Sequence, residues 1–129
     1  EEVAQINNWF SSRLEPLWKQ IKNIQIPLLI GCSGAFDTLA DLIDQTDPGT
    51  KTRIKQEIEI DDFNRIYEIL IKSTTAERMG MKGMESIRIE MIVPSVLFIK
   101  LVVDRLKIKK ICQTDFALRE GILYDRIFS

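Results

Sequence analysis

The hydrophobic residues of this 129-residue chain change their spacing at one point in its first third. Ile26 and residues 28–30 form a short continuous apolar run, which is typical of a strand buried on both faces. From Phe36 to Ile43, apolar residues recur at helical spacing instead. Between the two patterns lies the small-residue segment 31–35, Gly-Cys-Ser-Gly-Ala. The pattern predicts a strand, a tight turn and a helix whose free N–H groups form a candidate anion site.

The sequence predicts five further helical regions. An amphipathic helix covers residues 1–22 and breaks near Glu15, because Pro16 removes a backbone donor. Asp61 is the expected N-cap of the next helix, and Thr74 with Glu77 fits a capping box that opens a short helix ending at Gly80 or Gly83. The remaining two helices cover residues 85–106, with a bend at Pro94, and residues 117–127.

A second strand is predicted over residues 108–113. Each of the two principal strands precedes a turn and a helix, which indicates parallel neighbours joined by a helical crossover. Two parallel strands alone make a poor sheet, since parallel sheets need cover on both faces and usually more strands. The fold class is therefore helix-rich α/β. Residues 1–129 form one partial domain, whose missing strands come from sequence before Glu1 or from another chain.

Composition narrows the function classes. The chain has 18 Lys and Arg against 19 Asp and Glu, so it lacks the basic excess of proteins that bind nucleic acid or anionic membranes. It contains no histidine, which excludes histidine triads and relays within this chain. Two cysteines are too few for a disulfide framework and favour the reducing cytoplasm. The most apolar window, residues 91–103, is too short to span a bilayer.

Three segments together resemble one known family. They are Leu-Ile-Gly-Cys-Ser-Gly-Ala-Phe-Asp-Thr-Leu-Ala-Asp-Leu-Ile at 29–43, Glu-Arg-Met-Gly-Met-Lys-Gly-Met-Glu-Ser-Ile-Arg-Ile-Glu at 77–90, and Thr-Asp-Phe-Ala-Leu-Arg-Glu-Gly-Ile-Leu at 114–123. The sequence resembles the exopolyphosphatase and guanosine pentaphosphate phosphohydrolase family over nearly its whole length. The resemblance implies an actin-like fold of two ribonuclease-H-like domains, of which this chain is the latter part of the second.

The resemblance also implies a chemistry. Members of the family release the terminal phosphate of polyphosphate or of guanosine pentaphosphate, using Mg²⁺ and a glutamate that positions water. Sequence outside residues 1–129 supplies the metal-binding aspartates and that glutamate, so no catalytic or metal-binding residue is expected in this chain. The expected partners are the rest of the same protein and one of the two substrates.

The family pattern assigns roles to several residues here. Gly31, Ser33 and Gly34 match a glycine loop facing the phosphate cleft, so the predicted phosphate-binding residues are Gly31, Cys32, Ser33, Gly34 and Ala35. Ala35 stands where threonine is usual, so any side-chain phosphate contact at that position is in doubt. Arg88 matches the arginine of an Arg-x-Asp motif in which Glu90 replaces the aspartate. Arg119 and Glu120 belong to the closing motif, and these two residues and Arg88 have either a cleft role or a structural one.

Two other functions remain open from the sequence. Departures at Ala35 and Glu90 are compatible with a non-catalytic actin-like binding or scaffold module. The other is a self-standing helical interaction domain that covers exposed apolar surface as a homodimer.

Overall fold

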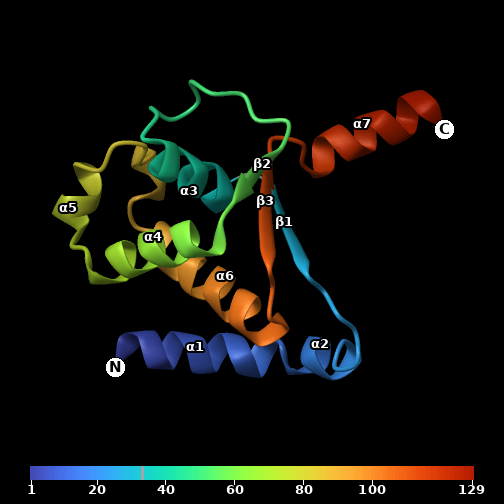
Figure 1. Cartoon of the computed structure of the whole chain (residues 1–129), viewed down its shortest axis with the longest axis horizontal. Coiled ribbons are helices and arrows are strands. Elements are labelled where there is room, and N and C mark those ends of the chain that lie inside the picture. The colour runs from blue at the N-terminus through green and yellow to red at the C-terminus, as the bar shows by residue number, and fades with distance from the viewer. Residues whose placement is uncertain (33) are drawn as a thin grey trace.

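The computed structural model describes residues 1–32 and 34–129. These residues form three strands, seven α-helices and one 3₁₀ helix (Figure 1). In chain order they are α1 (Glu2–Arg13), α2 (Glu15–Gln20), β1 (Leu28–Cys32), α3 (Ala35–Asp44), β2 (Gln56–Ile58), α4 (Ile60–Lys72), α5 (Thr75–Met79), η1 (Ser86–Arg88), α6 (Ile92–Leu106), β3 (Lys110–Thr114) and α7 (Leu118–Phe128).

The sheet has the strand order β1-β3-β2. β1 and β3 are parallel, with Leu29 opposite Ile111, which confirms the predicted parallel neighbours. β2 is a third strand beyond the two predicted; it pairs antiparallel with β3 and places Ile58 opposite Ile111. The result is a small mixed sheet in a helix-rich α/β fold, and the last strand of the sequence lies in its middle.

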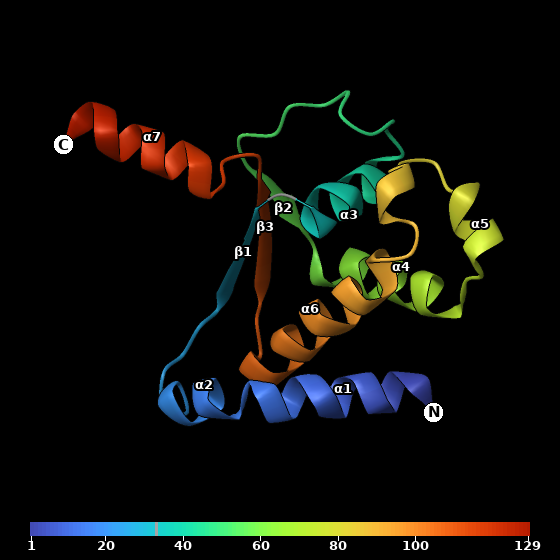
Figure 2. The same ribbon diagram turned by 180° about the vertical axis from the view of Figure 1, so that it is seen from behind.

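The hydrophobic core fills the space between one face of this sheet and helices α3, α4 and α6. Its largest fully buried apolar side chains are Phe63, Leu39, Leu70, Ile92, Leu97 and Ile111. Helix α1 lies across α6, where the rings of Phe10 and Phe98 meet edge to face at 5.1 Å. Figures 1 and 2 show this helical layer from front and back.

On the opposite face of the sheet, the side chains of β1 are uncovered in the part of the chain that the structure describes. Leu29 packs against the core and Gly31 is buried, whereas Leu28 and Ile30 are 43% and 60% exposed. The prediction that this strand is buried on both faces is therefore wrong for this chain. Its apolar run alternates between a packed face and an uncovered one, because successive side chains point to opposite faces of a strand.

Helix α7 projects away from the rest of the chain (Figure 2). None of its residues is buried, and its exposed apolar side chains are Leu118, Ile122, Leu123, Tyr124, Ile127 and Phe128. With the uncovered face of β1, this gives the chain two uncovered apolar surfaces. They agree with the prediction of a partial domain, which stays a prediction.

Several predicted helix boundaries hold and others do not. The first helix breaks at Leu14, so that Pro16 lies in the first turn of α2, and Thr74 with Glu77 forms the predicted capping box. The predicted helix over residues 85–106 is wrong in its first part, because α6 begins only at Ile92. Pro94 therefore lies in the first turn, where its missing N–H would have no partner within the helix, and bends nothing.

Two smaller features complete the fold. Glu59, and not Asp61, is the N-cap of α4. No helix in the described ranges is both long and apolar enough to cross a bilayer.

Core packing on α6 yields a direct stability test. Leu97→Ala should lower the free energy of unfolding by about 2–5 kcal/mol, because the lost methylenes leave a cavity under the sheet. Ile69→Ala on α4 is the control, since Ile69 is 45% exposed and its truncation should cost under about 1 kcal/mol. Urea unfolding of the two variants measures both values, and equal losses would contradict the assigned core.

Candidate phosphate-binding site

The turn between β1 and α3 depends on its two glycines. Gly31 is buried under the ring of Phe36, and a Cβ at this position would lie only 2.1 Å from ring carbons. Gly34 is the N-cap of α3 and has a φ of +61°, which favours glycine. The predicted strand, turn and helix are confirmed for residues 31, 32, 34 and 35, while Ser33 lies outside the described residues.

Helix α3 presents its N-terminus at this turn. Its first backbone bond runs from Thr38 N to Gly34 O at 3.2 Å, and the described residues provide no side-chain cap. Preceding N–H groups are therefore directed away from the helix, at the positive end of its dipole. This arrangement favours an anion, and Ala35 contributes only its backbone to it.

Arg88 lies beside the same turn. A Cβ on Gly34 would be 3.3 Å from Nη2 of Arg88, so the guanidinium packs directly against the glycine. Its nearest carboxylate oxygen, Oε2 of Glu85, is 3.5 Å from Nε, and this buried Nε has no hydrogen-bond partner among the described residues. The structure thus brings a cation with unused donor capacity to a helix N-terminus, where a bound anion would reduce the repulsion between them.

The other residues singled out from the sequence lie in three different environments. Glu85 and Arg119 both line a cavity of about 720 Å³ that also contains Asp37 and Asp115. Glu90 is exposed in the turn before α6. Cys32 is exposed and lines a separate apolar hollow between α1, α3 and α6.

Glu120 holds the start of α7. Its Oε2 accepts a hydrogen bond from Ala117 N at 2.8 Å, and its Oε1 accepts one from Nε of Arg119. The bond from Ala117 N–H, helped by Arg119, lowers the pKa of Glu120. A glutamate reaching back to the backbone at a helix N-terminus is a structural role, and it leaves the exposed Arg119 side chain at the cavity edge.

Sequence reasoning missed a buried polar group below the cavity. Gln113 of β3 is fully buried, and its Nε2 donates to Asp37 Oδ1 at 2.8 Å and to Asp115 Oδ1 at 2.9 Å. Oδ2 of Asp115 accepts from the backbone N–H of Arg53 at 2.5 Å. These bonds tie the end of β3 to the first turn of α3 and to the loop before β2.

Arg53 is the centre of a second set of bonds. Its guanidinium, 4% exposed, lies 2.8 Å from Asp41 and 3.1 Å from Asp44. Burial alone would raise the pKa of Asp44, but hydrogen bonds from Lys51, Arg53 and Gln56 together lower it. Two features of the sequence could have indicated these polar contacts: the polar residues at the carboxyl end of a predicted strand, and an arginine after the loop 45–52.

This part of the chain does not form a metal site by itself. Asp37, Asp115, Asp41 and Asp44 already accept hydrogen bonds or ion pairs from Gln113 and Arg53. No three Asp, Glu or Cys side chains among residues 1–32 and 34–129 converge to hold an ion. The Mg²⁺ implied by the resemblance therefore has no ligand set in the described residues.

Comparison with known proteins identifies the family of the chain. The model of the Ppx/GppA phosphatase family matches residues 1–129. The chain belongs to the Ppx/GppA phosphatase family. The matched range includes the turn, Arg88 and the closing Arg-Glu-Gly segment.

Individual relatives give the same result. The chain is similar to an exopolyphosphatase crystal structure from Cytophaga hutchinsonii, with a TM-score of 0.86 and 32% identity over 98% of this chain and 41% of that one. It is also similar to the Aquifex aeolicus family member, with a TM-score of 0.80 and 18% identity over 98% of this chain and 40% of that one.

One curated relative is compared by its sequence only. A putative exopolyphosphatase from Haemophilus influenzae is 25% identical over 113 residues, which are 88% of this chain and 33% of that protein. The chain therefore spans a third to two fifths of the length of these Ppx/GppA relatives.

The glycine turn can be tested by substitution. Gly34→Ala should lower the free energy of unfolding by about 1–2 kcal/mol, because alanine is strained at a φ of +61° and its methyl group would press on Arg88. Gly121→Ala in α7 is the matched control: it meets no atom within 4 Å and should be neutral or stabilising. Thermal unfolding measures both, and equal effects would rule out the assigned turn conformation.

The lowered pKa of Asp44 predicts a pH dependence. A group whose pKa is lower in the folded state adds stability above its unfolded pKa of about 4, and this stability is lost as the pH falls through the folded value. Asp44→Asn should therefore lose stability at pH 7 and show a shallower loss than wild type below about pH 4. Urea unfolding at a series of pH values from about 7 to below 4 measures the stability of this variant and of Asp125→Asn, an exposed control. The same pH dependence of stability in both variants would contradict the ion-pair network.

Proposed function

We propose that the protein releases the terminal phosphate of inorganic polyphosphate by hydrolysis, and that this chain forms one wall of the phosphate cleft. The observation that carries the proposal is the position of the Arg88 guanidinium against Gly34, at the N-terminus of α3. Membership of the Ppx/GppA phosphatase family and the similarity to exopolyphosphatases support polyphosphate as the substrate class.

The chemistry follows from the charges at the turn. Backbone N–H groups at the start of α3 donate to oxygens of the terminal phosphate, and Arg88 adds a charge-assisted donor from the side. Water attacks phosphorus in line, and the bond between that phosphorus and the bridging oxygen breaks. Donors fixed in place stabilise the charge that develops on the transferred group, without reorganising during the reaction.

The proposal divides the work between parts of the protein. The described residues offer donors to phosphate, but their carboxylates are engaged by Gln113 and Arg53. Residues outside this chain therefore activate the water and bind Mg²⁺. The isolated chain of 129 residues should release no phosphate from polyphosphate, and turnover by it would overturn this division.

Arg88→Gln in the intact protein tests the site. It should lower kcat/KM for polyphosphate by about 10–100-fold, the equivalent of losing one charge-assisted hydrogen bond of about 1.5–3 kcal/mol. Arg65→Gln on α4 is the matched control, because Arg65 also pairs with an acid three residues before it, Asp62. A Mg²⁺-dependent phosphate-release assay gives both rates, and a wild-type rate for Arg88→Gln would remove Arg88 from the site.

The same assay decides between substrates and functions. Release from guanosine pentaphosphate but not from polyphosphate would replace the proposed substrate. A non-catalytic binding module is the second candidate, favoured by Ala35, which has no hydroxyl to offer to phosphate. An intact protein that binds polyphosphate without releasing phosphate would establish that alternative.

A further inference from the structure

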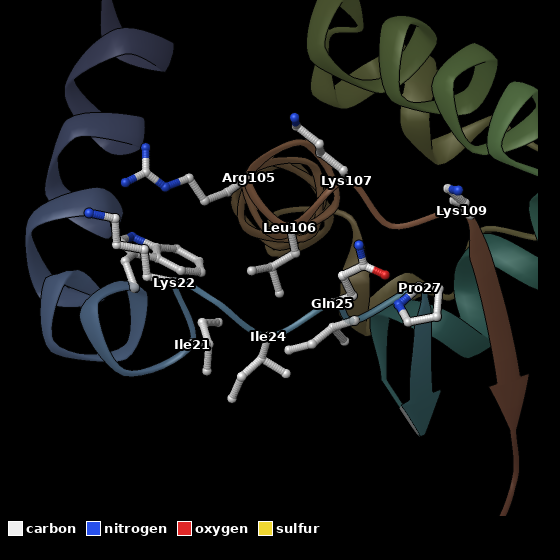
Figure 3. Close-up of a pocket in the computed structure, with 11 residues that line it drawn as sticks. Ile21, Lys22, Ile24, Gln25, Pro27, Arg105, Leu106, Lys107 and Lys109 are labelled. Carbon is white, nitrogen blue, oxygen red and sulfur yellow. The ribbon is translucent and has the colours of Figure 1, made fainter.

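A positively charged hollow lies at the other end of the strands from the glycine turn. It has a volume of about 590 Å³ and lies between two connections, the one from α2 to β1 and the one from α6 to β3 (Figure 3). Four of the residues that line it are cations: Lys22, Arg105, Lys107 and Lys109. No acidic side chain is among its described lining residues.

These four cations differ from most others in the chain. Ten of the 18 Lys and Arg residues form ion pairs within the described residues, and none of the four does so. Arg105 instead lies over the ring of Trp18, with Cζ 5.8 Å from the ring centroid. The chain as a whole carries a net charge of −1, so this cluster is a local concentration of positive charge and not part of a basic protein.

The helix dipole accounts for only part of the cluster. The C-terminus of α6 carries roughly half a negative charge, which cations in its last turn offset. Arg105 lies in that turn and Lys107 caps it in the left-handed conformation, with a φ of +52°. Lys22 and Lys109 belong to other segments, so the cluster exceeds what the helix end requires.

The two walls of the hollow are fixed to each other. The backbone N–H groups of Lys109 and Lys110 both donate to Pro27 O, at 2.9 and 3.0 Å. Between the walls lie apolar side chains, including Leu106 and the 6%-exposed Trp18. A ligand would therefore meet a preformed hollow, with only the lysine and arginine side chains to reorganise.

The arrangement of the charges suggests the shape of the ligand. In Figure 3, Lys22 and Arg105 lie near each other on the α2 side of the hollow, Lys107 lies at the end of α6, and Lys109 lies just before β3. A single phosphate can engage only part of this set. An extended anion with charges repeated along its length can engage cations on both sides of the hollow, with the apolar side chains beneath it.

We propose that this hollow, the α2–α6 cationic pocket, is a second binding site for an inorganic polyphosphate chain, remote from the glycine turn. The choice of polyphosphate over other polyanions rests on the proposed function. The pocket would hold a distant part of a long chain while its terminal phosphate lies at the cleft. Short substrates would not reach it.

Two double variants test the pocket in the intact protein. Lys22→Gln/Arg105→Gln removes one pair of charges, and Lys107→Gln/Lys109→Gln removes the other without disturbing the contact with Trp18. The control is Lys55→Gln/Arg126→Gln, which removes the same charge from two exposed cations that form no ion pair in the described ranges and do not line the pocket. Circular dichroism and thermal unfolding establish that each variant is folded.

Binding is measured by calorimetry with long-chain polyphosphate, tripolyphosphate and orthophosphate, in EDTA so that no hydrolysis occurs. Each pocket variant should bind long-chain polyphosphate about tenfold or more weakly than wild type, a loss of about 1.4 kcal/mol. Its affinity should also depend less steeply on salt, because fewer charges are screened. The pocket variants should lose less affinity for tripolyphosphate and orthophosphate than for long-chain polyphosphate. The control variant should keep the wild-type affinity for all three ligands.

The outcomes separate this inference from the proposed function. Equal long-chain affinity of wild type and both pocket variants, or no binding at all, overturns the pocket. Stronger binding of an RNA oligonucleotide that is lost in the same variants also overturns it, in favour of a nucleic-acid site. If polyphosphate binds through the pocket but the wild-type protein releases no phosphate with Mg²⁺, the hydrolytic function fails and the pocket stands.

Discussion

The pairing of β3 with both of its neighbours is the interaction on which the rest of this chain depends. β1 and β2 do not touch each other, and each is joined to the sheet only through β3. Ile111 in the middle of β3 faces Leu29 on one side and Ile58 on the other, under the core helices. Two residues further along β3, Gln113 donates hydrogen bonds to Asp37 and Asp115 in the buried polar group.

This dependence links the core to the site. Asp37 lies in the first turn of α3, so its hydrogen bond from Gln113 helps to fix the helix whose N-terminus faces the glycine turn. Asp115 also accepts from Arg53 N, which holds the loop ahead of β2. The glycine turn is therefore held from beneath by the central strand, in addition to the packing of Phe36 on Gly31. A site that must position donors precisely benefits from such support.

Local features of the sequence predicted local features of the structure well. The change of period at residues 31–35, the capping box of Thr74 and the break at Pro16 each follow from neighbouring residues, and each is confirmed. The features that the sequence analysis predicted wrongly or missed depend on residues far apart in the sequence. The exposure of Leu28 and Ile30 is decided by which elements cover the outer face of the sheet, and an apolar run does not carry that information. The polar group around Gln113 joins residues 76 positions apart, and no periodicity marks it.

The order of the strands also bears on how the chain folds. Leu28 pairs with Lys110, about eighty positions later in the sequence, so the parallel ladder is a contact between distant segments. At synthesis rates of about 5–20 residues per second, the ribosome needs several seconds to make the intervening chain. Throughout that interval the edge of β1 that β3 later occupies is unpaired, which makes the nascent segment a natural client for chaperones.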